Sequence, residues 1–188
     1  MNYLNSAELT GLIHHLNRKK EHAYFPFSVR HENLWSDGTT RKDFLNARAF
    51  SESIQEKLKT LDENTPVKVK GVLRSSKGSG ELYLDVNELE VIDALPETPE
   101  NSVTLTGYVH VIKAQNEGET GTGKYTRFAV RQDDAERGRD FIVVRVYDEK
   151  LRGILSGMND GDSVSVKGTL RSSRGSGVNY VRCGEIAE

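Results

Sequence analysis

Short runs of alternating apolar and polar residues recur along the chain, and a period of two is typical of β-strands that bury one face. Runs around Val67 and Val164 are two examples. Each is followed by a turn rich in Ser and Gly and then by a second alternating run, at 81–86 and at 178–183. We therefore predict a β-hairpin in each half of the chain.

The two predicted hairpins are copies of one unit. The segment 70–80 reads Lys-Gly-Val-Leu-Arg-Ser-Ser-Lys-Gly-Ser-Gly, and the segment 167–177 differs from it at two positions. An internal repeat of this kind constrains the fold before any other argument. The tripeptide Leu-Thr-Gly, which ends at Gly11 and at Gly107, marks the first strand of each copy. Glycine at these points allows a strongly curved sheet to bend.

The remaining elements repeat as well. A second strand around Phe27 matches one around Phe128, and a third strand at 43–50 matches one at 140–147. Apolar residues at helical spacing follow each third strand and predict a short helix. Three strands, a helix and two strands are the order of the OB-fold, a five-stranded Greek-key barrel that often binds oligonucleotides.

We therefore predict an all-β protein with one short helix per repeat, built as two tandem OB-fold domains. The first domain is expected at 1–93 and the second at 102–188. The segment 94–101 has two prolines and two acidic residues and is the predicted linker.

Alternate side chains of a strand point to opposite faces, so one buried residue fixes the direction of its neighbours. Ile142, Val144 and Val146 are aliphatic and are expected inside the second barrel. The same register in the other strands predicts an outer surface on which aromatic rings lie beside arginines. With the cations of the two hairpins, the candidate binding residues are Phe44, Arg48, Phe50, Arg74, Lys77, Tyr83, Tyr125, Arg127, Arg131, Phe141, Arg145, Tyr147, Arg171, Arg174 and Tyr180.

Exposed rings on a sheet face usually mark contact with a partner. Bases stacked on such rings contribute about 1 to 3 kcal/mol each, and nearby arginines reach phosphates. Other interpretations stay open: a loop, the helix or the other domain covers rings such as Phe44 and Phe50, and the hairpin cations are merely solvated. Trp35 either stacks on a base or closes one end of the first barrel.

Charge alone does not indicate a nucleic-acid partner. The 188 residues are 36% hydrophobic and 29% charged, ordinary values for one or two globular domains. The net charge is −2, whereas non-specific phosphate binding depends on clustered Lys and Arg. Division after Pro96 leaves both halves with slightly more acidic than basic residues. A nucleic-acid interface must therefore rest on the local placement of cations on one face.

Several functional classes are not expected. No apolar run approaches the roughly 20 residues of a membrane helix, and the N-terminus lacks a signal-peptide pattern. The single Cys183 cannot form an internal disulfide, so a cytoplasmic location is the default. The five histidines lack metal-ligand spacing, so neither a metal nor a cofactor is expected.

The segment Gly118–Lys124 matches the first seven positions of a phosphate-binding P-loop. The eighth position must be Ser or Thr to hold magnesium, but it is Tyr125, and a strand pattern rather than a helix follows. We interpret this segment as a Gly-rich hairpin loop between the first two strands. Since no Ser-His-Asp or paired-carboxylate arrangement shares a face, an enzyme is not expected.

The run from Phe141 to Tyr147, the helix after it and the run Gly161–Leu170 resemble the third strand, helix and fourth strand of bacterial single-stranded-DNA-binding (SSB) proteins. The resemblance implies that Phe141 and Tyr147 stack bases, with Phe44 and Phe50 as their equivalents in the first copy. The chain departs from that family in having two domains. It also lacks the acidic tail that recruits other proteins, so recruitment of that kind is not expected.

We therefore predict a non-catalytic, largely sequence-independent single-stranded DNA-binding protein that acts in DNA replication, recombination or transfer. RNA remains an alternative ligand, and a homodimer would present four barrels. The competing hypothesis is an OB-fold protein-interaction module or accessory subunit. Salt distinguishes the two, because nucleic-acid affinity falls steeply with rising salt and apolar docking does not.

Overall fold

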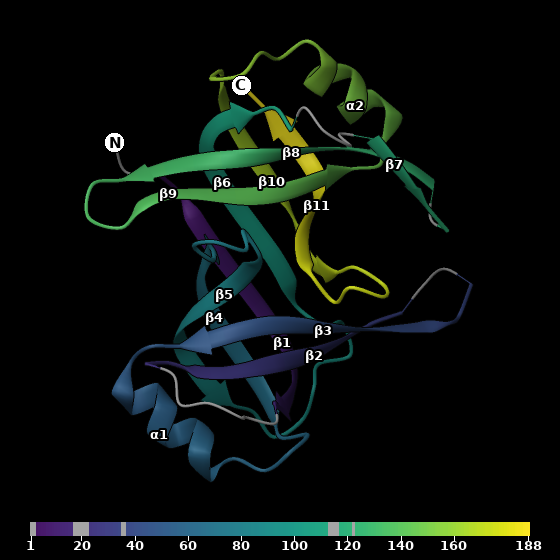
Figure 1. The fold of residues 1–188 in the computed structure, drawn as a ribbon. Coiled ribbons are helices and arrows are strands. Elements are labelled where there is room, and N and C mark those ends of the chain that lie inside the picture. The colour runs from purple at the N-terminus through teal and green to yellow at the C-terminus, as the bar shows by residue number, and fades with distance from the viewer. Residues whose placement is uncertain (1–2, 17–22, 35–36, 113–116, 122) are drawn as a thin grey trace.

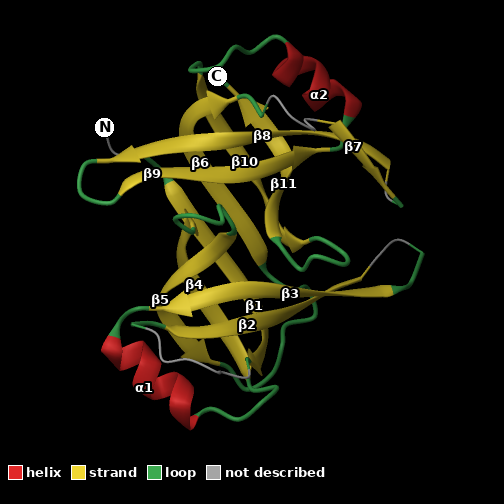
Figure 2. Cartoon of the chain, viewed as in Figure 1, coloured by secondary structure: helices red, strands yellow, loops and turns green. Residues whose placement is uncertain are grey.

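The computed structural model describes residues 3–16, 23–34, 37–112, 117–121 and 123–188. This part of the chain forms two barrels that lie one above the other, each with a short helix near its outer end (Figures 1 and 2). The predicted tandem of two OB-fold barrels is confirmed. Trp35 lies outside the described residues.

The first barrel has a helix between its third and fourth strands. Its elements are β1 (Asn5–His15), β2 (Phe25–Leu34), β3 (Thr40–Ala49), α1 (Glu52–Thr60), β4 (Pro66–Ser75) and β5 (Leu82–Val91). The second barrel repeats this order with one short strand added, as β6 (Asn101–His110), β7 (Glu117–Thr120), β8 (Gly123–Asp134), β9 (Gly138–Val146), α2 (Glu149–Ser156), β10 (Ser163–Ser172) and β11 (Asn179–Ala187).

The added strand β7 pairs with the start of β8 in the segment that matches a P-loop. Lys124 and Tyr125 lie within β8, so a strand follows the glycines, as the sequence indicates. A P-loop needs a helix N-terminus at this point to face the phosphate, and the chain supplies a strand instead. The segment is part of a small hairpin beside the second barrel (Figure 1).

Hydrogen bonding closes both barrels. The first runs β1-β2-β3-β5-β4 and returns to β1, and the second runs β6-β8-β9-β11-β10 and returns to β6. Ile142, Val144 and Val146 are fully buried, as their alternation predicts, and Phe27 and Phe128 are among the largest buried side chains. The predicted direction of these strands is therefore correct.

The helices close the outer ends of the barrels. In α1, Ile54 and Leu58 are buried against the core, in agreement with the helical spacing. Asp148 caps α2 by accepting a hydrogen bond from the amide of Leu151 at 3.0 Å. Within the described part of the chain, no helix is both long and apolar enough to cross a membrane.

The two barrels share one continuous sheet, because β1 pairs with β6 in antiparallel register. Ala7 lies opposite Val103, its own equivalent in the repeat, and Asn5 opposite Leu105 mirrors Leu9 opposite Asn101. The pairing is therefore self-complementary about a local two-fold axis, as in an isologous dimer interface. One chain thus contains a contact that two separate copies would otherwise make.

Gly11 and Gly107 lie where the first strand of each barrel changes partner. Residues 5–9 of β1 pair with β6, and residues 12–15 on the other side of Gly11 pair with β2. A Cβ atom on Gly11 would lie 2.6 Å from the carbonyl oxygen of Arg30, and one on Gly107 would lie 2.5 Å from that of Arg131. Glycine is required here because the crossing backbone leaves no room for a side chain.

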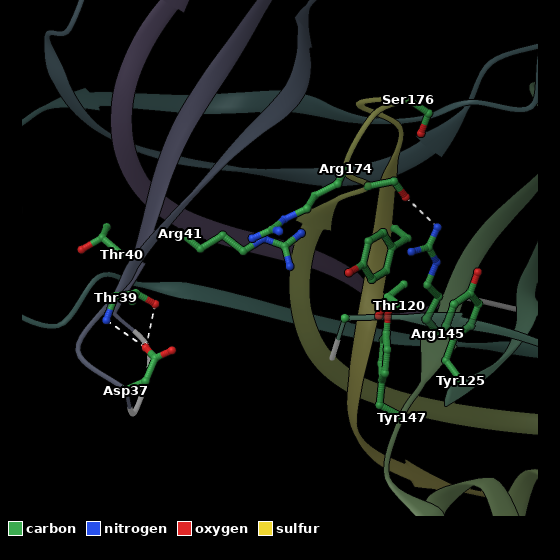
Figure 3. A pocket seen from close by; sticks show the side chains of 13 residues that line it. Asp37, Thr39, Thr40, Arg41, Thr120, Tyr125, Arg145, Tyr147, Arg174 and Ser176 are labelled. Carbon is green, nitrogen blue, oxygen red and sulfur yellow. Dashed lines mark hydrogen bonds between the residues drawn. The ribbon is translucent and has the colours of Figure 1, made fainter. Parts of the chain in front are cut away.

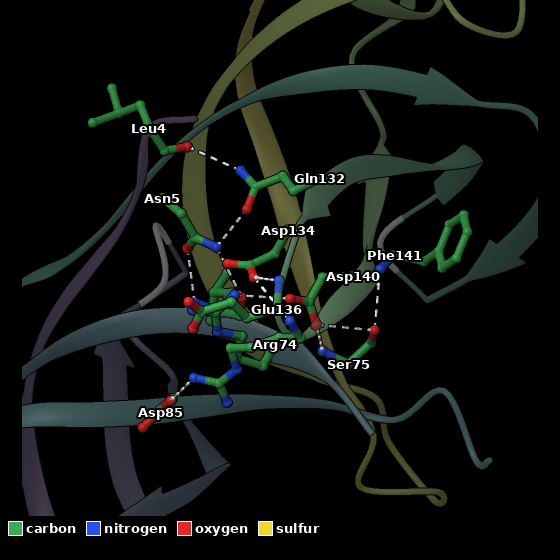
Figure 4. Close-up of polar contacts among 12 residues, drawn as sticks. Leu4, Asn5, Arg74, Ser75, Asp85, Gln132, Asp134, Glu136, Asp140 and Phe141 are labelled. Carbon is green, nitrogen blue, oxygen red and sulfur yellow. Dashed lines mark hydrogen bonds and ion pairs between the residues drawn. The ribbon is translucent and has the colours of Figure 1, made fainter. Parts of the chain in front are cut away.

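Two aspartates reinforce the contact between the barrels. In the first barrel, Asp43 of β3 is completely buried and accepts hydrogen bonds from Arg171 Nε at 2.8 Å and from the Ser172 amide at 3.1 Å. Its equivalent, Asp140 of β9, accepts from Arg74 Nη1 at 2.9 Å and from the Ser75 amide at 2.8 Å. Figure 4 shows the contacts of Asp140 with Arg74 and Ser75. Each barrel thus anchors the β-hairpin of the other through a charge-assisted contact.

Other polar contacts across the interface follow the local symmetry only in part. Asn5 donates from Nδ2 to Gln132 Oε1 at 2.8 Å, close to the start of the shared sheet (Figure 4). Asn179 Oδ1 accepts from the Asn46 amide at 3.1 Å, and its Nδ2 donates to the Asn46 carbonyl at 3.0 Å. The equivalent positions in the repeat are Leu82 and Val143, so this amide pair occurs on one side of the axis. The interface is therefore symmetric in its backbone pairing and in the two aspartate contacts but not in every side chain.

The structure places 92–100 between β5 and β6, in the region where the sequence predicts a linker. Glu100 is tied to β1, because its carbonyl accepts from the Thr10 amide at 2.9 Å and its amide donates to Thr10 Oγ1 at 2.9 Å. The domain bounds at 93 and 102 stay a prediction.

Asp43→Asn removes the buried charge and leaves Arg171 without its ion pair. Breaking a buried pair by removing one partner costs roughly 3–5 kcal/mol, so the free energy of unfolding in urea should fall by that order. Asp133→Asn is the matched control, since Asp133 is 39% exposed and pairs with surface arginines, and exposed pairs contribute about 1 kcal/mol or less. Equal losses in the two variants would contradict the anchoring role of Asp43.

Candidate nucleic-acid interface

A guanidinium packed among aromatic rings forms the centre of the candidate surface on the second barrel. The Arg145 guanidinium lies 3.9 Å from the Tyr180 ring and 4.8 Å from the Tyr125 ring. Tyr147 lies beside Tyr125, with ring centroids 5.3 Å apart. These four residues line one pocket (Figure 3) and are called the second-barrel cluster.

The first barrel contains the same arrangement at the equivalent positions. The Arg48 guanidinium lies 3.9 Å from the Tyr83 ring and 4.7 Å from the Tyr24 ring, and the Phe50 ring lies 5.2 Å from that of Tyr24. We call Tyr24, Arg48, Phe50 and Tyr83 the first-barrel cluster. Its formation from equivalent residues shows that the duplication preserves this surface as well as the fold.

The strand order explains how each cluster assembles. Arg48 and Phe50 have the outward parity of β3, and Tyr83 comes from β5, which is the parallel neighbour of β3. The hairpin that follows fixes the arginine: Arg48 Nη2 donates to Ser76 Oγ at 2.7 Å, and Arg145 Nη2 donates to Ser173 Oγ at 2.6 Å. The second serine of the repeated Ser-Ser turn therefore has a structural role, which is to hold one guanidinium over the rings.

Some rings are covered and others are open. Tyr83 and Tyr180 point away from the barrel interior as expected, but the arginines cover them, and they are only 7% and 3% exposed. Burial raises the pKa of both phenols, which therefore stay neutral. Phe50 at 40% exposure is open, and Tyr147 is half-buried. Phe50 is therefore open to a base, whereas Tyr147 is open only in part, because the Arg182 guanidinium lies 4.6 Å from its ring.

A second ring lies nearer the start of the third strand of each barrel, β3 and β9. Phe44 is 41% exposed and packs edge-on against His14 at 5.0 Å, and Phe141 lies 4.8 Å from His110. Hydrogen bonding fixes the first histidine, because its Nδ1 lies 2.6 Å from Glu63 Oε1. The sequence analysis left the histidines without a role. Their repetition after each Leu-Thr-Gly could have identified them as partners of the rings.

The two clusters differ in charge at one position. In the second barrel, Arg182 lies over the Tyr147 ring at 4.6 Å, and sequence reasoning did not select it. Its equivalent in the first barrel is Asp85, which forms an ion pair with Arg137 at 3.8 Å. Burial raises the pKa of Asp85, although Arg137 opposes that shift. A second guanidinium thus lies beside the second-barrel cluster, whereas the equivalent position beside the first-barrel cluster holds a carboxyl group paired with Arg137.

The remaining candidate cations divide into two groups. Lys77 and Arg174 are exposed at the tips of their hairpins, as expected. Arg74 and Arg171 are not at the tips. Each lies one strand position before the turn, where it is ion-paired to an aspartate of the other barrel. Of the four hairpin cations predicted as binding residues, two are therefore exposed at the tips, and the other two, Arg74 and Arg171, hold the barrels together.

Arg127 and Arg131 lie on β8 with outward parity and are half-buried. Arg127 is opposite Arg145 of the second-barrel cluster in the β8–β9 register. Arg131 lies 5.2 Å from the Tyr108 ring and 3.4 Å from Asp133, beside β6 rather than beside the cluster. The structure thus places Arg127 on the strand next to Arg145, and Arg131 further along the same strand.

A pocket of about 710 Å³ opens between the barrels beside the second-barrel cluster. The first barrel contributes the turn and the start of β3, from Asp37 to Arg41, and the second barrel contributes β7, the cluster and the β10–β11 hairpin (Figure 3). Its lining contains aromatic rings, three arginines and the carboxylate of Asp37, and rings beside arginines suit a base and its phosphate.

Comparison with solved structures identifies the arrangement. The wild-type single-stranded DNA binding protein from Thermus aquaticus superimposes with a TM-score of 0.76 at 17% identity, covering 100% of this chain and 94% of the other. The two proteins share one fold. A deletion variant of the same Thermus aquaticus protein gives a TM-score of 0.74 at 17% identity, over 99% of this chain and 94% of that one. No family model and no curated protein matches the sequence. The likeness therefore rests on structure and covers both OB barrels and their arrangement.

Cys183 supplies no reactive group to this surface. It is 7% exposed within the core of the second barrel, and burial raises the pKa of its thiol to about 11. Because the thiolate is the nucleophile, the native thiol should react with DTNB at pH 8 roughly a hundredfold more slowly than the thiol of the urea-unfolded chain. Equal rates in the two states would show that the second barrel opens readily around β11.

Proposed function

We propose that the protein binds single-stranded DNA, largely without regard to sequence and without catalysis. The observation that carries this proposal is the paired clusters, in which equivalent positions of two barrels hold a guanidinium over aromatic rings, with the exposed ring of Phe50 and the half-buried ring of Tyr147 beside it. Open rings accept bases by stacking, which is tolerant of sequence because every base has a π-face.

The placement of charge supports a nucleic acid over a protein partner. Arg48 and Arg145 lie within 3.9 Å of tyrosine rings, so the same surface offers apolar faces to bases and cations to phosphates. Arginine and tyrosine also occur at protein interfaces, and the salt dependence of binding separates a nucleic acid from a protein partner. A net charge of −2 is compatible with this arrangement, because local placement rather than total charge sets phosphate binding.

Single strands suit the surface better than duplexes, because the bases of a duplex are already stacked and paired. The Thermus aquaticus neighbour with the same fold is described as a single-stranded DNA binding protein. We extend that ligand to this chain and propose a cytoplasmic role in DNA replication, recombination or transfer. DNA is proposed ahead of RNA on the strength of that neighbour.

Fluorescence anisotropy with labelled dT and rU oligomers, each titrated at two salt concentrations, tests the proposal. Single-strand binding should weaken as salt rises, with a slope of about −0.7 in log K per phosphate contact. We expect tighter binding of dT than of rU. Absence of binding to both oligomers at low salt would overturn the function, and salt-independent binding would favour an apolar docking surface.

Phe141→Ala/Tyr147→Ala removes two ring positions of the second barrel and should weaken oligo-dT binding. Each stacked base contributes about 1–3 kcal/mol, so the affinity should fall roughly tenfold or more. Ile154→Ala is the matched control, because Ile154 is 46% exposed on α2, away from both clusters. Unchanged dT affinity in a double variant that melts like the wild type would remove this surface from the proposal.

The two clusters should contribute unequally. Tyr147 lies beneath Arg182, whereas Phe50 belongs to the cluster that has Asp85 at the equivalent position. Tyr147→Ala should therefore reduce dT affinity more than Phe50→Ala, measured by the same anisotropy titration. A larger loss in Phe50→Ala would show that the carboxyl group of Asp85 does not weaken the first barrel as a phosphate site.

A further inference from the structure

The pocket beside the second-barrel cluster adjoins a second pocket of about 480 Å³. The second pocket is lined by Phe44 of the first barrel, and the first by Tyr147 of the second barrel. Four residues line both pockets: Thr40, Arg41, Ser173 and Arg174. The four shared residues, two of them arginines, therefore lie between a ring of the first barrel and a ring of the second.

We propose that Arg41 and Arg174 together hold one phosphate at the point where a bound strand passes from the first barrel to the second. This proposal rests on the proposed function and gives the bound DNA strand a path between the barrels. The strand runs from Phe44, past the two arginines, to Tyr147.

Arg41 is held in position by the contact between the barrels. Its Nη2 donates to the carbonyl of Ser172 at 3.0 Å and lies 3.5 Å from Asp43 Oδ1, and its side chain is only 13% exposed. Asp43 is shared, because its other oxygen accepts from Arg171 at 2.8 Å. One carboxylate thus serves two guanidiniums, and the site keeps an excess of positive charge.

Arg174 is exposed at the tip of the β10–β11 hairpin, and among the described residues no carboxylate lies within ion-pair distance of it. Figure 3 shows its guanidinium directed toward that of Arg41. Like charges repel, so two guanidiniums facing one pocket wall favour an anion between them. A phosphate matches them well, because a guanidinium fork binds its oxygens bidentately.

An acidic group limits where the phosphate can lie. Asp37 lines the larger pocket on the turn before β3, where its Oδ1 accepts hydrogen bonds from the Thr39 amide at 2.9 Å and from Thr39 Oγ1 at 2.6 Å. These bonds lower the pKa of Asp37, so the carboxylate stays charged. It repels a phosphate from that end of the pocket and leaves Arg41 and Arg174 as the favourable position.

The local symmetry breaks at this site. The equivalent of Arg174 is Lys77, but the equivalent of Arg41 is Gly138, which has a φ of 90° in the tighter β8–β9 turn. Gly138 offers no side chain at this position, and the neighbouring Arg137 is paired with Asp85 at 3.8 Å. The two-arginine site therefore occurs on one side of the local two-fold axis. The bound DNA is expected to cross between the barrels on that side.

The test compares Arg174→Ala with its matched control Lys77→Ala. Both remove one exposed cation from the same position of a hairpin. Anisotropy is measured with a dT oligomer long enough to span both barrels, about 35 nucleotides, and with one of about 8 nucleotides that a single OB barrel accommodates. Salt is varied for each. Arg41 is left intact because its bond to Ser172 is structural.

With the long oligomer, Arg174→Ala should reduce the slope of log K against log salt by about 0.7, and Lys77→Ala should change it less. With the short oligomer, Arg174→Ala should bind nearly as well as the wild type. Two outcomes would overturn the proposed phosphate site at the crossing while leaving the binding function intact. One is an equal change of the salt slope in the two variants with the long oligomer, and the other is an equal loss of affinity by Arg174→Ala with the long and the short oligomer. A wild type that binds neither oligomer would overturn both proposals.

Discussion

The antiparallel pairing of β1 with β6, locked by two reciprocal aspartate contacts, is the constraint on which the rest of the molecule depends. A lone OB barrel would leave the outer edge of its first strand unpaired, and exposed strand edges invite pairing with other chains. Here the duplicated copy covers that edge, and Asp43 and Asp140 each bind the hairpin of the opposite barrel. The two ring clusters are therefore held in a fixed relation without a second chain.

The same contact explains why the hairpin sequence is preserved in both copies. Within the repeated Leu-Arg-Ser-Ser segment, Arg171 reaches across to Asp43, the Ser172 amide joins that contact, and Ser173 Oγ holds Arg145 against its tyrosines. One short turn thus serves the assembly of the barrels and the shape of the binding surface. Where the copies differ, as at Arg182 and Asp85 or at Arg41 and Gly138, the surface becomes asymmetric while the shared framework does not.

Much of the fold could be predicted because duplication presents every pattern twice. Alternation in β9 placed Ile142 and Val146 inside the barrel, and the element order of each copy indicated the OB-fold. The clusters themselves follow from strand parity, which put Arg48 and Phe50 on the outer face. β7 was not foreseen, since a four-residue strand within a glycine-rich segment carries little alternation.

The contact between the barrels could not be predicted in the same way. Asp43 and Asp140 are ordinary polar residues at the start of a strand, and their burial depends on how two barrels dock. For that reason the sequence suggested that Arg74 and Arg171 were free tip cations. Arg41 was missed because it lies beside the opposite barrel, and Arg182 because it lies in β11 between the buried residues Val181 and Cys183.

Hydrogen–deuterium exchange of the intact chain, with and without a dT oligomer that spans both barrels, tests the central claim most directly. Docked barrels that present one continuous surface predict slower exchange on binding in the turn at 37–41 and in the hairpin at 173–177 together, while α1 and α2 remain unchanged. Protection confined to the hairpin of one barrel, or located on the helices, would contradict the account.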